Sequence, residues 1–546
     1  MSPPQRALAA ALLAILLGAG AARADEIAEL VSRRVEELRA GHEVRVGRDR
    51  IASTRVLPDL YERAGFQLLW TRPGAAQELF AAVRDADAHG LDPDDYHRPE
   101  IERRLADPPR DAAGRVDFDL LLTDAMVRLA YHLVFGKVDA KRLDPHWNLA
   151  REIDGESALE RLLAVPEAPW IPDALAAFAP SHRAYHRFQG ALARYRALAD
   201  AGGFEPVPAG PKLAQGSEGP RVLALRRRLA VEGDLAQDAV DSPLFDAELE
   251  KGVKRAQRRY RLERDGVVGP ATLAALNVSA QARVDQIRVN LERARWVLFA
   301  VAGRLVLVDV ASFHLHYIDG DLDWSTRVVV GRPYRKTPSF RAEIRELLLN
   351  PTWTIPPTIL RNDVIPDVRK DLGYLARKQM RVLDAQGREV DPRRVDWASA
   401  AAGHFPYRIR QDAGPGNSLG RIKFVMPNPY TVYLHDTPAT ELFERAERAA
   451  SSGCIRVEHP LVLATLLLGD PERWSHPQLE AEIAKGETRT VTLPEPVPVI
   501  VMYWTVDVDA DGTVYFPKDL YGRDPAVLRA LDADFSFRSS VAGGRR

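Results

Sequence analysis

The sequence predicts a multidomain α+β protein with a mainly helical N-terminal part, a compact three-helix unit and a β-rich C-terminal domain that carries an insertion. Three observations lead to this prediction. The chain has 546 residues, too many for a single hydrophobic core. Apolar residues recur at helical spacing in the N-terminal part. Beyond residue 300 the apolar runs become short and β-branched, as is typical of strands.

Composition narrows the class of protein without identifying it. Hydrophobic residues make up 46% and charged residues 28% of the chain, as in an ordinary soluble globular protein. The net charge of −1 gives no reason to expect nucleic acid or an anionic membrane as a partner. Cys454 is the only cysteine, which excludes an intrachain disulfide and any zinc site that needs two thiolates.

Residues 1–24 have the pattern of a cleavable signal peptide. Arg6 is followed by a short apolar run over residues 7–20, and Ala22-Arg23-Ala24 fits a cleavage site, so the mature protein is expected to start near Asp25 in the periplasm. The run is shorter than the ~20 residues of a spanning helix, although an uncleaved signal anchor stays an alternative. No other apolar run is long enough, so we expect no stable membrane span.

The next segments are predicted to be helical. Residues 25–205 form a scaffold domain, in which Gly136 fits a helix C-cap, and a Pro/Gly-rich linker follows over residues 206–211. Residues 212–280 form the three-helix unit, with a D-G-x-x-G-x-x-T pattern from Asp265 to Thr272. This unit resembles the peptidoglycan-binding-like module, which implies a cell-wall partner. A helical spacer that no longer binds wall stays the alternative.

Residues 285–524 are predicted to form the β-rich domain. Strands are expected over residues 305–310, 313–317, 326–331 and 347–353, a terminal hairpin over 497–516, and a tail over 525–546. A charged segment at about residues 365–410 is interpreted as an insertion that forms a lid at the rim of the active site. His314 and His316 share one strand face, but no third ligand is evident, so we expect no metal site.

The stretch from Tyr430 to His459 carries the chemistry. A strand leads to His435, a helix is expected over residues 441–450, and a tight loop precedes Cys454. A thiol activated by a neighbouring imidazole is a competent nucleophile for acyl transfer. The N–H groups of Gly453 and Cys454 would form an oxyanion hole. Arg456 should share the face of Cys454, where it would lower the thiol pKa or bind a substrate carboxylate, unless it is a solvated surface charge.

The run S-S-G-C-I-R-V, with L-H-D-T-P upstream, resembles the catalytic domain of the L,D-transpeptidase family. The long form with a helical scaffold looks like its YcbB-type subgroup, as do residues 328–337, 350–357 and 414–424. Ser452 stands where many relatives have His. The group that orients His435 stays open between a backbone carbonyl, Asp436 and Ser452.

This resemblance implies a reaction and its participants. Cys454 would attack a tetrapeptide donor stem of peptidoglycan and release D-alanine, with His435 as base. The amine of an acceptor stem would then form a 3→3 cross-link, without a cofactor. Family membership also implies acylation by carbapenems. Ser452 is grouped with the oxyanion and substrate contacts, and Tyr433 and Trp353 would line the donor site, unless both are core aromatics. Any partner cell-wall synthase stays open.

Four other functions are weighed against this one. Water as acceptor would make the protein an L,D-carboxypeptidase. A sortase-like transpeptidase also orders His, Cys and Arg along a barrel, but its cysteine lacks the preceding glycine. A zinc hydrolase using Cys454, His435 and His459 has weak ligand spacing. A non-catalytic wall-binding scaffold would not need an intact His435 and Cys454.

Overall fold

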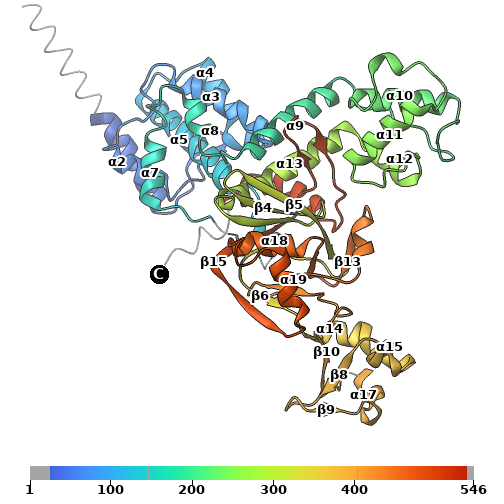
Figure 1. Cartoon of the computed structure of the whole chain (residues 1–546). Helices are drawn as coiled ribbons and strands as arrows, with labels where there is room; N and C mark the ends of the chain where they lie inside the picture. Colours follow the sequence, from blue (N-terminus) through green and yellow to red (C-terminus); the bar gives the residue numbers. More distant parts are fainter. Residues whose placement is uncertain (1–24, 145–146, 150, 402–403, 538–546) are drawn as a thin grey trace, which may run out of the picture.

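The computed structural model describes residues 25–144, 147–149, 151–401 and 404–537. The predicted signal peptide and the last nine residues of the predicted tail lie outside these ranges. The predicted fold class is confirmed: a helical N-terminal part, a three-helix module and an insertion project from a β-rich domain (Figure 1). None of the described helices has both the length and the apolarity that crossing a bilayer requires.

The scaffold is built around one long helix, α5 (Ala112–Phe135), which is buried along most of its length. Asp111 begins this helix by accepting a hydrogen bond from the Gly114 N–H at 3.1 Å, and Gly136 ends it at a φ of 82°, as its sequence predicted. The surrounding elements are α2 (Leu57–Arg63), α3 (Ala75–Asp85), α4 (Arg98–Ala106), α6 (Ala140–Leu143), α7 (Gly155–Leu163), α8 (Ile171–Ala176), α9 (Arg183–Asp200) and the hairpin β1 (Arg45–Val46) and β2 (Asp49–Arg50).

Helix α13 (Ala280–Val297) connects the scaffold to the β-rich domain. Ser279 caps its first turn, and the helix packs along α9 and against α20 (Asp524–Leu531). Its Asn290 side chain donates to Thr505 Oγ1 at 2.8 Å and accepts from the Thr505 N–H at 2.9 Å. Because the C-terminal segment returns to this helix, the scaffold and the catalytic part share one continuous core.

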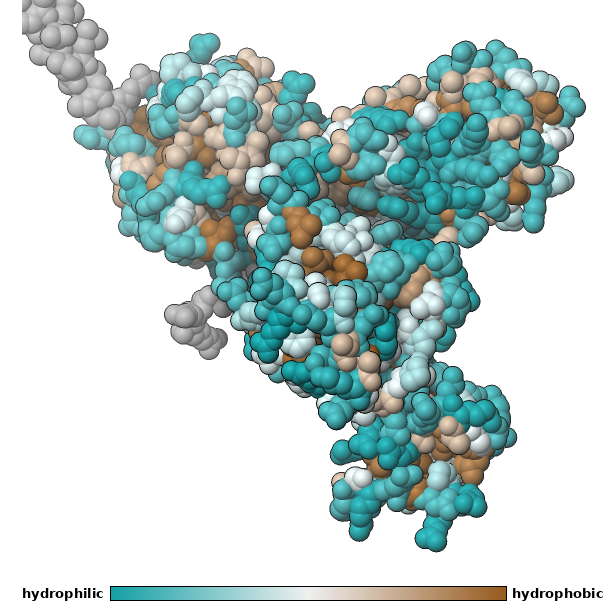
Figure 2. Space-filling model, viewed as in Figure 1, coloured by the Kyte–Doolittle hydropathy of each residue, from teal (hydrophilic) through white to brown (hydrophobic). Residues whose placement is uncertain are grey.

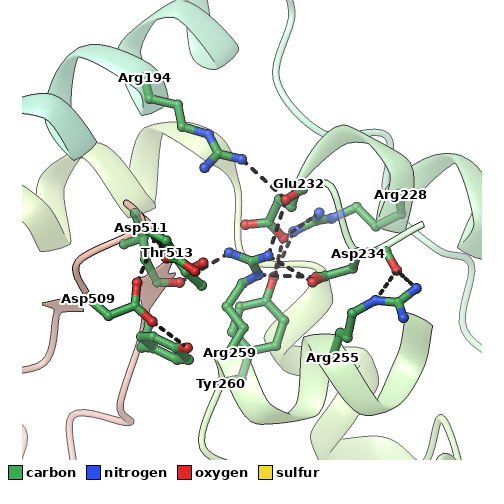
Figure 3. A network of polar contacts seen from close by, with 12 residues as sticks. Arg194, Arg228, Glu232, Asp234, Arg255, Arg259, Tyr260, Asp509, Asp511 and Thr513 are labelled. Carbon is green, nitrogen blue, oxygen red and sulfur yellow. Dashed lines mark hydrogen bonds and ion pairs between the residues drawn. The ribbon is translucent and has the colours of Figure 1, made fainter. Parts of the chain in front are cut away.

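The three-helix module contains α10 (Pro220–Val231), α11 (Ala247–Arg259) and α12 (Pro270–Leu276). Proline occupies the first turn of α10 and α12, where its missing N–H costs nothing. A buried polar network joins the module to its neighbours (Figure 3). The Glu232 carboxylate accepts from Tyr195 of α9 at 2.7 Å and pairs with Arg228 at 2.7 Å. Arg259 pairs with Asp234 at 2.8 Å and donates to the Val514 carbonyl at 3.2 Å.

The β-rich domain is a closed, barrel-like sheet in the order β13-β5-β14-β12-β11-β6-β15-β3-β4, with β4 pairing back onto β5. Its inner side chains form a separate apolar core that α18 (Pro460–Leu468) and α19 (His476–Ala484) cover. The strands are β3 (Leu305–Asp309), β4 (His314–Asp319), β5 (Leu322–Gly331), β6 (Phe340–Leu349), β11 (Ile422–Val425), β12 (Leu434–His435), β13 (Ala449–Ser451), β14 (Ile455–Val457) and β15 (Arg489–Met502). The predicted terminal hairpin is present as β16 (Asp507–Val508) and β17 (Val514–Tyr515).

The insertion is a small unit with its own sheet, in the order β7-β10-β8-β9, and its own apolar core. It begins at Trp353 rather than near residue 365 and ends at Gln411, because β7 and β10 pair at its base. It lies at the far end of the molecule from the module (Figure 1). Its elements are β7 (Trp353–Thr354), α14 (Pro357–Ile359), a π-helical turn (Leu360–Val364), α15 (Ile365–Lys370), α16 (Gly373–Arg377), β8 (Met380–Leu383), β9 (Glu389–Val390), α17 (Trp397–Ala401) and β10 (Arg408–Gln411).

Two local predictions were wrong. Where a helix was expected over residues 441–450, the structure has a short 3₁₀ turn, Thr440–Glu444, followed by strand β13, which pairs with β5. Sheet pairing overrides the helical propensity of this segment, because the Val330 N–H donates to the Arg448 carbonyl at 2.9 Å. The single strand expected over 347–353 is interrupted at Asn350, whose φ of 46° separates β6 from β7.

Candidate functional site

Hydrogen bonds hold each of the three residues before Cys454, Ser451 to Gly453, in place. Ser451 Oγ donates to the Cys454 carbonyl at 2.5 Å and accepts from the Gly453 N–H at 3.1 Å. Thr337 Oγ1 donates to the Gly453 carbonyl at 2.9 Å. Gly453 has a φ of 117°, which favours glycine. A Cβ on Gly331, across the loop, would lie 2.1 Å from the Arg335 carbonyl, so the neighbouring strand also requires glycine.

These contacts change the expected oxyanion hole. The Gly453 N–H already donates to Ser451 Oγ, so it cannot bind an oxyanion without breaking that bond. The Cys454 N–H remains as the candidate donor of the predicted pair. Ser452 also has a different place than expected: its Oγ accepts from Arg335 Nη1 at 2.8 Å. The same guanidinium pairs with Asp363 of the insertion at 2.5 Å, so it links the insertion to the loop that carries the nucleophile.

His435 is buried and has a defined tautomer. Its Nδ1 lies 2.5 Å from the Asp436 carbonyl, which can only accept, so in the neutral ring Nδ1 carries the proton and Nε2 carries the lone pair. The backbone of Leu419 also interacts with the ring. Of the three orienting groups left open by the sequence, the structure therefore places the backbone carbonyl at the ring. The Asp436 carboxylate accepts from the Arg421 N–H at 2.8 Å, and Ser452 is bound to Arg335.

Strand register brings the predicted residues to one face. Strands β12 and β14 run parallel, with His435 opposite Arg456 and Leu434 opposite Ile455. Since side chains alternate along a strand, Tyr433 and Cys454 share the face of His435 and Arg456. Lys423 of β11 pairs with His435 from the other side of β12, so it lies on the same face. We call these five residues, Tyr433, His435, Cys454, Arg456 and Lys423, the catalytic row.

Lys423 is the residue that sequence reasoning missed. Its Nζ lies 3.8 Å from the centroid of the Tyr433 ring, and burial lowers the pKa of this amine. No local pattern indicated it, because lysine on a strand is usually a solvated side chain and only the register with His435 brings Lys423 to this face.

The electrostatics of the row keep both reacting groups neutral. Burial, with Arg456 and Lys423 nearby, lowers the pKa of His435 to about 3. Burial also raises the pKa of the Cys454 thiol, and Tyr433, Lys423 and Arg456 offset this only in part. The thiol Sγ lies 3.7 Å from the Thr431 carbonyl. The thiol and the imidazole on this face are therefore both neutral near neutral pH.

The two predicted aromatic residues lie at this site. The hydroxyl of Tyr433 interacts with Trp353 and with Cys454, and burial raises its pKa to about 12. Trp353 comes from the first strand of the insertion, so that unit contributes to the surroundings of the thiol. Both side chains are half-buried.

The other histidines considered for metal binding lie apart from this row. His314 Nδ1 is bound to the Ser312 carbonyl at 2.8 Å, and His459 is exposed beside Glu458. In the described ranges, no three His, Cys, Asp or Glu side chains are arranged to hold a metal ion.

Comparison with known proteins agrees with this arrangement. Residues 303–500 match the "L,D-transpeptidase catalytic domain", residues 218–276 the "Putative peptidoglycan binding domain" and residues 55–192 the "Scaffold domain". The fold and the site are thus those of a chain that joins an L,D-transpeptidase catalytic domain to a domain of the peptidoglycan-binding type.

One relative shares substantial sequence. The chain is 37% identical over 244 residues to a "Putative L,D-transpeptidase" of Haemophilus influenzae, a match that covers 44% of this chain and 49% of the relative. The match thus spans about half the length of that protein.

Two solved structures are more distant. An L,D-transpeptidase from Xylanimonas cellulosilytica has 17% identity and a TM-score of 0.18, covering 55% of this chain and all of its own. A fused Zn-dependent amidase/peptidase/peptidoglycan-binding domain-containing protein from Clostridium acetobutylicum has 11% identity and a TM-score of 0.15, covering 54% of this chain and all of its own. At these TM-scores, neither structure is used to infer the fold or the function of this chain.

Proposed function

We propose that this protein forms 3→3 cross-links in peptidoglycan through a thioester on Cys454. The observation that carries the proposal is the row on β12 and β14, where the only thiol and an imidazole whose Nε2 carries the lone pair share one face of an L,D-transpeptidase catalytic domain. Peptidoglycan is the substrate class that the module and the catalytic domain both support.

The first half-reaction uses the neutral pair. As the Cys454 sulfur adds to the carbonyl carbon of residue three in a tetrapeptide stem, the thiol proton moves to Nε2 of His435. Arg456 and Lys423 stabilise the anionic charge that develops on this face. The tetrahedral intermediate then expels D-alanine, whose amine takes the proton back from His435, and a thioester remains.

The second half-reaction restores the thiol. The amine of an acceptor stem attacks the thioester carbonyl and loses a proton to His435, which returns it to the departing thiolate. Water in place of the amine would give an L,D-carboxypeptidase. Both half-reactions use only side chains of this protein and groups of the two substrates, so we propose that no cofactor takes part.

The test uses purified protein and disaccharide-tetrapeptide. We expect release of D-alanine, a cross-linked dimer in muropeptide analysis and one covalent adduct on Cys454 detected by mass spectrometry. Incubation with meropenem should also give a single covalent adduct on Cys454. Cys454→Ala should lose all three and keep its melting temperature. Release of D-alanine without dimer would assign the carboxypeptidase reaction. Wild-type protein inert to both compounds would refute the proposal.

We also propose that the protein acts in the periplasm, on the basis of the signal-peptide pattern in residues 1–24. Fractionation of cells expressing the full chain should recover a processed form that begins near Asp25. A full-length cytoplasmic form would contradict this.

A further inference from the structure

A second site lies between the module and the catalytic domain. A cleft of about 840 Å³ opens between α11 with the loop that follows it and the ends of β4, β5 and the turn at Thr440–Glu444. In the view of Figure 2, hydrophilic residues predominate where the lobe that carries α11 faces the β-rich domain. We call this space the module cleft.

The module cleft is strongly cationic in a chain whose net charge is only −1. Its lining holds two carboxylates, Glu263 and Glu444. Three of its cations have carboxylate partners: Arg327 with Glu444 and Glu458, Lys254 with Glu250, and Arg261 with Asp507. Six others lie within 4 Å of no carboxylate in the described part of the chain: Lys251, Arg255, Arg258, Arg264, Arg445 and Arg448.

One of these cations is buried, which a solvated surface patch would not explain. Arg448 is 8% exposed, and among the described residues its guanidinium donates only to the carbonyls of Arg445 at 2.9 Å and Phe313 at 3.2 Å. Its Nε is buried and has no hydrogen-bond partner among these residues. Burial and the nearby Arg327 lower its pKa to about 10, although Glu458 and Glu444 oppose this shift. Neither carboxylate reaches the guanidinium as an ion pair, so this buried charge favours an additional anion in the cleft.

The walls of the cleft are fixed relative to each other. Arg259, at the end of α11, donates to the Val514 carbonyl, and the Phe516 N–H donates to the Arg259 carbonyl at 2.8 Å. Both partners belong to the C-terminal hairpin, which returns to the β-rich domain. The cations of the two walls are therefore held together without a ligand, as a preorganised anion site requires.

The module cleft is connected to the catalytic row through the end of strand β14. Arg327 is bound to Glu458, four residues beyond Cys454 along the same chain direction. At the strand rise this corresponds to roughly 13 Å. Cys454, Arg456 and Glu458 share one face by alternation, so the thiol and the residue that binds Arg327 lie on the same side of this strand.

We propose that the module cleft binds the free carboxylates of peptidoglycan stem peptides, holding one part of the wall while a neighbouring stem occupies Cys454. The proposal rests on the proposed function for the identity of the wall polymer. Carboxylate is the anion that fits, because one wall of the cleft belongs to a peptidoglycan-binding domain. Binding at this second point raises the effective concentration of stems at the thiol.

The test compares two double variants of the full mature chain. Lys251→Glu with Arg264→Glu reverses two exposed cleft cations, neither of which is near the thiol. Lys212→Glu with Arg227→Glu is the matched control, because it reverses one lysine and one arginine exposed on the same module outside the cleft. Binding to purified sacculi is measured by cosedimentation at low and at high salt.

We expect the cleft variant to bind sacculi at least tenfold more weakly than wild type at low salt, and the control to bind within twofold. Sacculi whose carboxylates have been amidated should bind wild type as weakly as native sacculi bind the cleft variant. Salt should weaken wild-type binding toward the same level, since exposed charges are screened. Equal binding by the two double variants, or unchanged binding of amidated sacculi, would overturn the proposal.

A separate readout distinguishes failure of this proposal from failure of the proposed function. Release of D-alanine from soluble disaccharide-tetrapeptide needs only the catalytic row, so both double variants should keep the wild-type rate. If wild type releases no D-alanine, the proposed reaction is wrong. If wild type releases D-alanine but reversing the cleft charges does not change binding to sacculi, only the assignment of the cleft is wrong.

Discussion

The module interface buries cations together with their anions, whereas the catalytic face holds half-buried cations without them. At the interface, Arg228 and Arg259 are paired with Glu232 and Asp234 (Figure 3). On the catalytic face, Lys423 and Arg456 lie within 4 Å of no carboxylate among the described residues, and Arg456 Nε is buried without a partner. Paired charges fix the position of a domain, whereas unpaired charges favour an anion that arrives with the substrate.

The largest effect should come from breaking the paired set. Glu232→Gln removes the carboxylate that Arg228, Tyr195 and Tyr260 surround, and leaves buried positive charge unmatched. We expect a loss of about 3–5 kcal/mol in the free energy of unfolding, measured by urea denaturation. Glu248→Gln, at an exposed position of α11 in the same module, is the control and should change stability by less than about 0.5 kcal/mol. Similar unfolding curves for both variants would show that the network is not structural.

Acid should weaken the same network in a defined window. Burial opposes ionisation of Glu232, but Arg228 and Arg259 prevail and lower its pKa from 4.5 to about 2. Because the pKa is lower in the folded state, this stabilisation is complete above pH 4.5 and is lost as pH falls toward 2. Over that window the contribution is about 3 kcal/mol. Urea titrations of wild type and Glu232→Gln should converge at the acid end, and parallel curves down to pH 2 would contradict the assignment.

Removing an unpaired cation of the catalytic face should change the reactivity of the thiol and should not reduce the stability of the fold. Arg456→Met or Lys423→Met removes positive charge near the thiol, so the pKa of Cys454 should rise further. Alkylation of Cys454 by iodoacetamide at pH 7 should therefore slow, while the free energy of unfolding stays the same or increases. In wild type the alkylation rate should still be rising at pH 9, because burial keeps the thiol pKa above its ordinary value. A plateau near neutral pH would instead indicate a thiolate–imidazolium pair.

Sequence patterns were sufficient where local chemistry decides the structure. The caps of α5, the prolines that begin α10 and α12, and the face shared by Cys454 and Arg456 all follow from local rules. The wrong predictions are those that long-range contacts decide. Residues 441–450 have helical composition, yet Arg448, Ala449 and Ser451 pair with β5. Lys423 joins the site only through register with His435, which no local pattern encodes.

The smallest effect concerns the insertion, which contacts the nucleophile loop through Arg335. Asp363→Asn weakens the Asp363–Arg335 pair, which is partly exposed, so the free energy of unfolding should change by less than about 1 kcal/mol. The loop at Ser451–Gly453 should nevertheless open more often, because Arg335 loses the partner that holds it against Ser452. Amide hydrogen exchange of the peptide containing Gly453 should therefore be severalfold faster. Asp367→Asn breaks a comparable pair with Lys370 in the same insertion, at a position with no contact to the loop, and should leave that exchange unchanged. If both variants exchange like wild type, Arg335 does not couple the insertion to the thiol, and Trp353 remains as the contribution of the insertion to the site.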